Sequence, residues 1–283
     1  MQSHRNKVWG KRHKRRILTR AFCAALASLT CCATALGAAP TASGQAYDFK
    51  IQIGVASVPV LNIGPVDQVQ FSDLASAYEN AQSALSFDSG GGLGVLARLQ
   101  TGALDAETQW LPGPGFLAIG SRASANNVDL GVVNAIGGSL LSLKAPLIRS
   151  TAIISGACPT APIMRPANAV HIVDDYVYRN GFEIPNLQAS STAMVQGSQP
   201  GQSIDLSVTG VDVVNIPSDP AANTMVATGV VGATLVVNEQ TLTGDGISGL
   251  GVASNAFHLS LNIAGIITAD VVISHAQASI ACN

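Results

Sequence analysis

Alternation of apolar and polar residues is the feature of this sequence that most constrains its fold. In the segment 203–208, Ile204, Leu206 and Val208 alternate with serine and aspartate residues. The same alternation occurs at residues 49–53, 128–132, 257–263 and 271–273. A period of two places the apolar side chains on one face of a β-strand. The sequence therefore predicts a protein made of many half-buried strands.

The composition supports strands over helices. Charged residues make up only 11% of the chain, and long charged side chains of this kind normally cover helix surfaces. Turn-forming clusters at residues 217–220, 243–246 and 264–265 separate the alternating segments. We therefore expect an all-β protein with an antiparallel β-sandwich or barrel-like domain. A parallel β-solenoid is the alternative, although the sequence has no repeat of fixed length.

Two segments leave a local choice open. In residues 233–242, the inward side chains are either Leu235 and Val237 or, with the register shifted by one, Val236. Residues 72–85 have the pattern of a helix, because a Ser-Asp pair that suits a helix cap precedes apolar residues at helical spacing. The alanine and serine content of their second half permits a strand instead.

The N-terminal segment has the parts of a secretory signal. Residues 1–20 carry eight of the fifteen Lys and Arg residues and no acid, and an apolar run follows over residues 21–39. We expect cleavage after Ala35, Ala38 or Ala46. Two other interpretations are an uncleaved membrane anchor over the apolar run and lipidation at one of the adjacent cysteines 31 and 32.

Removal of the leader, residues 1–46, leaves a single large β-rich domain over residues 47–283, with a proline-bearing stretch at 158–170 that could subdivide it. This domain keeps 15 − 8 = 7 basic residues against 17 acidic residues, a net charge of −10. We therefore expect no nucleic-acid partner and no stable membrane insertion after cleavage. The expected location is secreted or periplasmic.

Two cysteines remain outside the leader, Cys158 and Cys282. Two is the number required for one disulfide, and an exported protein meets oxidising conditions. We expect a bridge within the chain. Two free thiols or a bridge between chains are the alternatives.

Candidate catalytic residues are few. The mature chain has three histidines, and His258 lies on the polar face of an alternating strand. We interpret it as a cross-strand hydrogen-bonding residue near Asn238 or Asn255. The polar triplet Asn238, Glu239 and Gln240 precedes a glycine-rich turn, and we interpret it as a strand end. We expect no catalytic residue, metal ion or cofactor.

One polar cluster is the exception that could carry chemistry. Residues 171–183 include His171, Asp174, Asp175 and Glu183. Their spacing does not match the zinc or calcium ligand motifs. The mature chain also has no Gly-x-Ser-x-Gly motif of a serine hydrolase.

Three motifs of the chain occur together in a known group of proteins. An Asn-Glu-Gln triplet follows an apolar strand at 238–240, an Asn-Ala-Phe-His-Leu strand occupies 255–259, and Ala-Asp-Val-Val at 269–272 precedes a final cysteine. In these motifs the chain resembles the choice-of-anchor P family of secreted bacterial proteins over about residues 85–282. The resemblance implies an exported β-rich domain without an assigned activity. It also places Cys158 and Cys282 at the family's cysteine positions.

These observations favour a non-catalytic structural or interaction protein of the bacterial envelope or extracellular space, with envelope or cell-surface proteins as partners. One alternative is a β-module that binds a small molecule or lipid, which requires an apolar cavity. The other is a hydrolase that uses the acidic cluster at 171–183.

Overall fold

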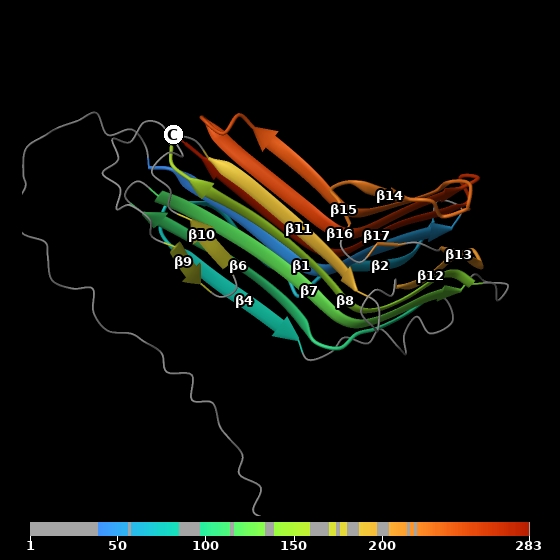
Figure 1. Cartoon of the computed structure of the whole chain (residues 1–283). Helices are drawn as coiled ribbons and strands as arrows, with labels where there is room; N and C mark the ends of the chain where they lie inside the picture. Colours follow the sequence, from blue (N-terminus) through green and yellow to red (C-terminus); the bar gives the residue numbers. More distant parts are fainter. Residues whose placement is uncertain are drawn as a thin grey trace, which may run out of the picture. The chain divides into compact units, whose positions relative to one another are not determined.

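The structure is a computed structural model. The residues that it describes are 39–55, 58–84, 97–113, 116–133, 139–158, 170–173, 176–179, 187–196, 204–213, 216–217 and 220–282. In these ranges no helix is long and apolar enough to span a membrane. The strands lie in two long, curved layers (Figure 1).

The first layer, sheet A, joins the start of the domain to its end. Its strands, in spatial order, are β14 (Thr224–Val226), β15 (Ala233–Gly244), β16 (Gly249–Ile263), β17 (Ile267–Ala281), β1 (Thr41–Val55) and β2 (Val58–Val66). Strand β3 (Val69–Leu74) pairs with the first half of β1. All these pairings are antiparallel.

The second layer, sheet B, is formed by the middle of the chain. Its strands, in spatial order, are β13 (Val211–Val213), β12 (Asp205–Val208), β8 (Ser139–Gly156), β7 (Phe116–Val133), β6 (Leu104–Gly113) and β4 (Tyr78–Ala84). Strand β11 (Gln188–Gln196) also pairs with β8, and β5 (Ala97–Gln100) pairs with β7. A separate hairpin consists of β9 (Val170–Val173) and β10 (Tyr176–Arg179).

The long strands determine the architecture. Each of β1, β7 and β8 pairs along one side with another long strand and along the other side with two shorter strands in succession. The two antiparallel sheets do not close into a barrel. The predicted all-β sandwich is therefore confirmed, and the solenoid alternative finds no support.

The apolar side chains predicted to face inward are in the core. The buried set includes Phe49, Ile51, Ile53, Val128, Leu130, Val132, Ile204, Leu206, Val208, Phe257, Leu259, Leu261, Val271 and Ile273. Leu235 and Val237 are fully buried, which decides the register of β15 against Val236. Full burial of one such side chain contributes about 1.5–3 kcal/mol, so a one-residue slip of a strand is strongly disfavoured.

The alternation changes phase once along each long strand of sheet A. In β17 the inward positions are odd-numbered up to Ile273 and even-numbered from Ser274 onward, although Val272 is also buried. The neighbouring strands change phase at the same level, at Asp48, Asn238 and Ala256. Asn238 and Ser274 have φ angles of 53° and 55°, in the left-handed region. Such a residue turns the following side chain to the other face of the sheet.

The helix expected in residues 72–85 is wrong. Strand β3 ends at Leu74 and strand β4 begins at Tyr78, so the segment contains two strand parts. Tertiary contacts override the local helical pattern, because Tyr78 pairs with Trp110 of β6 and its ring packs in a tilted arrangement against Phe71, with ring centroids 4.6 Å apart.

The expected boundaries of the domain also change. Strand β1 begins at Thr41, not after residue 46, and its first residues pair with Ala281 and Ile280 of β17. Cleavage after Ala46 would remove these paired residues from the sheet. Strands β8 and β11, which lie on the two sides of the stretch 158–170 in the sequence, pair with each other.

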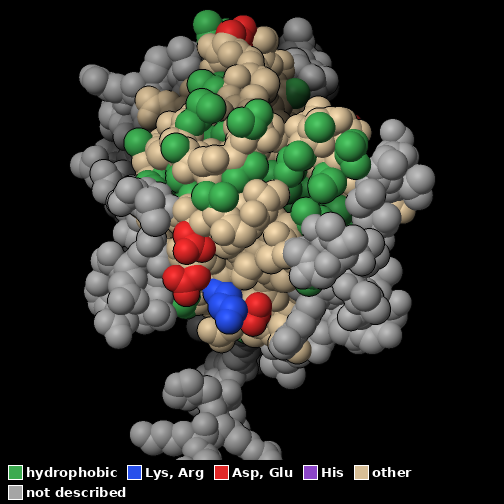
Figure 2. Space-filling model, turned by 90° about the vertical axis from the view of Figure 1, so that its right-hand side faces the viewer, with side chains coloured by type: hydrophobic (Ala, Val, Ile, Leu, Met, Phe, Trp, Pro, Cys, Tyr) green, Lys and Arg blue, Asp and Glu red, His purple; other side chains and the backbone are tan. Residues whose placement is uncertain are grey.

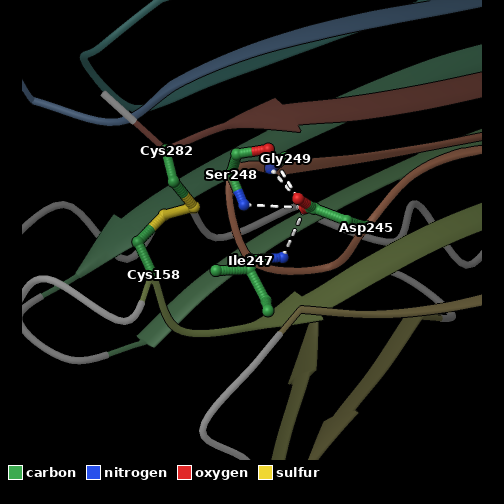
Figure 3. The surroundings of a disulfide bond; sticks show 6 residues. All are labelled: Cys158, Asp245, Ile247, Ser248, Gly249 and Cys282. Atoms are coloured by element: carbon green, nitrogen blue, oxygen red, sulfur yellow. Dashed lines mark hydrogen bonds between the residues drawn. A yellow bond between two sulfur atoms is a disulfide. The ribbon is translucent and has the colours of Figure 1, made fainter.

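A disulfide and a tight loop hold one end of the sandwich (Figure 3). Cys158 and Cys282 are bonded, with Cα atoms 5.5 Å apart and a sequence separation of 124, as the cysteine count predicted. Beside them, the carboxylate of Asp245 accepts hydrogen bonds from the backbone N–H groups of Ile247, Ser248 and Gly249. These bonds lower the pKa of Asp245 to about 2, so its carboxylate is ionised and accepts them at pH values well above 2.

Candidate functional site

The polar triplet and His258 belong to a larger polar cluster on the outer face of sheet A. Two adjacent rows of cross-strand neighbours supply it. One row runs from Glu239 through Asn255 and His275 to Tyr47, and the next contains His258 and Lys50. Asp270 of β17 completes the cluster, which we call the histidine cluster.

The phase change brings the histidine cluster together. Glu239 is two residues beyond Val237, and in an uninterrupted strand both side chains would point into the core. The left-handed residue Asn238 between them turns Glu239 outward. Ser274 has the same effect on His275, which would otherwise share the face of Ile273. Glu239 and His275 therefore lie on the outer face of sheet A because β15 and β17 are irregular at Asn238 and Ser274.

Asn238 and Gln240 point inward and fix this irregularity. The side chain of Asn238 is buried and donates to the carbonyl oxygen of Pro220 at 2.7 Å. The Gln240 Nε2 donates to Asn238 Oδ1 at 2.8 Å and to the carbonyl of Ser191 in sheet B at 3.2 Å. Asn223 Oδ1 accepts from the backbone N–H of Gln240 at 2.7 Å. The triplet is thus a support that joins the two sheets, with only Glu239 in the outer cluster.

His258 is held between two carboxylates. Its Nδ1 lies 2.7 Å from Glu239 Oε2, and its Nε2 lies 2.8 Å from Asp270 Oδ1. Carboxylates accept hydrogen bonds, so each ring nitrogen donates one and the imidazole is positively charged. Burial lowers the pKa of His258, but the hydrogen bonds and charges of Asp270 and Glu239 outweigh it and raise the pKa above 6.5.

A second histidine continues the network in a different protonation state. Asn255 donates from Nδ2 to Glu239 Oε2 at 2.7 Å, so its Oδ1 accepts from His275 Nδ1 at 2.7 Å. The His275 ring stacks on Tyr47, with centroids 4.6 Å apart. Burial lowers the pKa of His275 to about 4, so this ring is neutral at pH 7. Burial and the charge of Asp270 raise the pKa of Tyr47 to about 12.

The charges of the cluster largely balance. The His258 imidazolium has a carboxylate on each side, and the Lys50 Nζ lies 4.0 Å from Asp270 Oδ2. The side chains of Glu239, His258 and Asp270 are about one-third exposed, between 26% and 39%. The cluster therefore joins β15, β16, β17 and β1 across their outer face and remains accessible to a partner.

Two cavities on the same face flank the histidine cluster. One, of about 530 Å³, adjoins Asp270 and is lined by polar residues, Gln52, Asn62, Ser260, Asn262 and Thr268, together with Ile53, Gly54, Pro59, Leu61, Leu261 and Ala269. The other, of about 410 Å³, lies toward the disulfide end and is lined by Ser43, Gly44, Gln45, Gln70, Phe71, Ser72 and Gln277. Hydroxyl and amide groups that can donate and accept hydrogen bonds thus extend along most of the face.

Asp48, at the line where the alternation changes, is a buried acid that sequence reasoning missed. Its side chain is fully buried on the inner side of sheet A. Burial and the neighbouring carboxyl of Asp67 raise the pKa of Asp48 to about 9. The group is therefore a neutral acid at pH 7. A single aspartate between apolar residues gave no sequence signal for this state.

The structure describes some of the predicted site residues and not others. His258 and Glu239 meet directly, while Asn238 and Gln240 lie behind them. The partners Lys50, Tyr47 and Asp270 were missed, because no local pattern joins β1 to β17. In the cluster at 171–183, His171 lies in β9 opposite Tyr178. Asp174, Asp175 and Glu183 lie outside the described residues. In the described ranges no group of three His, Cys, Asp or Glu side chains could hold a metal ion.

Comparison of the chain with protein-family models, with curated proteins and with solved structures found no match.

Proposed function

We propose that this chain is an exported, non-enzymatic interaction protein that binds a partner in the cell envelope or extracellular space through the outer face of sheet A. The observation that carries the proposal is the histidine cluster between two cavities, one with mainly amide and hydroxyl side chains and the other with such side chains beside apolar residues. Such a surface offers many fixed hydrogen-bonding groups and little net charge. Polar rims and half-buried charge networks of this kind suit recognition.

The state of His258 argues against a catalytic function for the same cluster. A general base needs a ring nitrogen that is free to accept a proton from a nucleophile or water. Both nitrogens of His258 donate to carboxylates, and its pKa is raised. The cluster therefore suits a cross-strand clamp better than acid–base catalysis.

Export rests on the N-terminal segment and the disulfide. The basic and apolar parts of residues 1–39 have the composition of a signal, and the Cys158–Cys282 bond requires an oxidising compartment. The resemblance to the choice-of-anchor P family points in the same direction. Because β1 begins at Thr41, we expect the mature chain to start after Ala35 or Ala38.

The test combines localisation with directed disruption of the face. N-terminal sequencing of the protein from fractionated cells gives the cleavage site and the compartment. Proteins that co-purify after crosslinking are then compared between the wild type, Gln52→Arg and Ser260→Arg. Both positions are exposed on the outer face of sheet A. The matched controls are Gln188→Arg and Ser190→Arg, at exposed positions of β11 in sheet B.

We expect a partner that is lost with the two variants of sheet A and retained with the two controls. Equal retention in all four variants would contradict the use of this face. A hydrolytic activity of the purified protein that disappears in His258→Gln would contradict the non-enzymatic assignment.

A further inference from the structure

The end of the sandwich opposite the disulfide carries a group of exposed aliphatic side chains. Val231 is 94% exposed, Ile266 57%, Val211 43% and Val133 37%. They come from the β14–β15 loop, the β16–β17 turn, the β12–β13 hairpin and the end of β7, and therefore from both sheets. Figure 2 shows hydrophobic side chains spread over this face, with the charged side chains gathered mainly along one part of it. We call these four residues the apolar tip.

The loop that carries Val231 is held in a fixed shape. The Thr228 hydroxyl donates to the carbonyl of Ala233 at 3.2 Å and accepts from the N–H of Val230 at 3.3 Å. Gly232 has a φ of 83°, and its carbonyl accepts from the N–H of Asn262 at 2.7 Å. Val230 packs against the core while Val231 points away from it. Val231 is therefore exposed on a loop whose conformation is fixed by hydrogen bonds.

Backbone hydrogen bonds also fix the neighbouring turns. The N–H of Ile266 donates to the carbonyl of Ile263 at 2.9 Å, and the N–H of Thr209 donates to the carbonyl of Leu140 at 2.8 Å. Backbone groups that are satisfied internally cost little when water is removed from them. The β14–β15 loop lies close to the β12–β13 hairpin, because a Cβ built on Gly229 would lie 3.3 Å from the Cγ1 of Val211.

The charges near the apolar tip indicate which kind of surface it can bind. Residues 220–238 and 261–269, which supply Val231 and Ile266, contain no charged side chain, whereas the exposed Asp212 follows Val211 in the β12–β13 hairpin. The mature chain has the net charge of −10 derived above. Anionic surfaces would repel the protein. The tip also protrudes and has only four side chains, whereas a standard protein interface uses about 20–30 residues on each side. A fluid surface of uncharged lipid accommodates a few protruding aliphatic groups without a matching shape.

We propose that the apolar tip docks reversibly on a membrane surface of zwitterionic lipid, with Val231 and Ile266 inserted into the interfacial layer. The Cys158–Cys282 end and the outer face of sheet A then remain in water. This docking is independent of the partner proposed for sheet A, and either can hold without the other.

The test is flotation of the exported, disulfide-bonded chain with phosphatidylcholine vesicles. The variants Val231→Asp and Ile266→Asp place a charge at the tip. The controls Leu242→Asp and Ile247→Asp place the same charge at side chains that are 66% and 52% exposed near the disulfide end. Unfolding midpoints measured for all four variants show whether each is folded. Because these positions are exposed, the fold should tolerate the changes.

We expect the wild type and both controls to float with the vesicles, and each tip variant to bind at least about tenfold more weakly, the effect of losing one buried aliphatic side chain. Vesicles with anionic lipid should bind less protein. Absence of wild-type flotation, or equal loss in the controls, would overturn the proposal. So would a concentration-dependent dimer that Val231→Asp abolishes, because the occupant of the tip would then be a second copy of the chain. Gln52→Arg should leave flotation unchanged, which separates this result from the test of sheet A.

Discussion

Replacement of Asn238 tests whether a single left-handed residue holds the candidate site in place. Asn238→Ala removes the hydrogen bonds of the buried side chain to Pro220 and Gln240. A buried polar group that loses its partner costs about 1–3 kcal/mol. Alanine, unlike asparagine, has no polar side chain whose local hydrogen bonds offset the cost of the left-handed conformation, which adds up to about 1–2 kcal/mol. We therefore expect the free energy of unfolding to fall by about 3 kcal/mol.

The matched variant is Asn238→Gly. It loses the same hydrogen bonds but adopts a positive φ without steric cost, although the unfolded chain gains about 0.5–1 kcal/mol of conformational freedom. The two effects leave Asn238→Gly more stable than Asn238→Ala by about 0.5–1 kcal/mol. In an ordinary strand position the order would be reversed, because glycine is the poorer strand residue.

Urea unfolding of the disulfide-bonded protein measures this difference, and NMR titration of His258 gives a second measurement. If Asn238 turns Glu239 outward, the glycine variant keeps the raised pKa of His258, whereas the alanine variant lowers it toward 6.5. Glycine less stable than alanine, with identical titration of His258 in both, would refute the explanation.

Three further variants and one reduction experiment test the titrating groups and the disulfide. His258 has a folded-state pKa above 6.5, so its stabilising contribution is complete below pH 6.5 and is lost as the pH rises through the folded value; the stability difference between wild type and His258→Gln should shrink over that range. His275 has a folded-state pKa of about 4, so the wild type should lose stability, by up to about 3 kcal/mol, as the pH falls from 6.5 to 4, and His275→Gln should lose less. Asp48 remains protonated up to a pKa of about 9, so ionisation in the unfolded chain destabilises the wild type as the pH rises from 3.8 to 9; Asp48→Asn should be stabilised relative to the wild type by an amount that grows over this range in denaturant titrations. Reduction of the Cys158–Cys282 bond, which closes a sequence separation of 124, should lower stability by about 4–5 kcal/mol, and an unchanged urea midpoint after confirmed reduction would contradict the loop-entropy argument.

The periodic parts of the fold could be predicted from the sequence, because burial imposes a period of two on a strand regardless of its partners. Phe257, Leu259 and Leu261 were identified as core residues in this way, whereas the choice between Leu235 with Val237 and Val236 was left open. The helix over 72–85 was predicted wrongly, because Tyr78 takes its conformation from pairing with Trp110 across sheet B. Local propensity carries no information about such a partner.

The candidate site was only partly predictable for a related reason. The sequence singled out Glu239 and His258, but the period of two gives the wrong face for Glu239 unless the left-handed residue before it is known. That conformation depends on Pro220, eighteen positions away in the chain. Asp270 and Lys50 join the cluster through pairing between β17 and β1, which no local pattern records.

The pairing of β1 with β17 has a consequence for the order in which the chain can fold. Thr41 lies opposite Ala281 and Val55 lies opposite Ile267, so the N-terminal strand lacks its long neighbour until the final strand is available. Contacts this distant in sequence form slowly and late. Sheet A therefore remains incomplete while the chain is being synthesised. A chain with this topology completes sheet A, and brings Cys282 to Cys158, only after its last strand has been made.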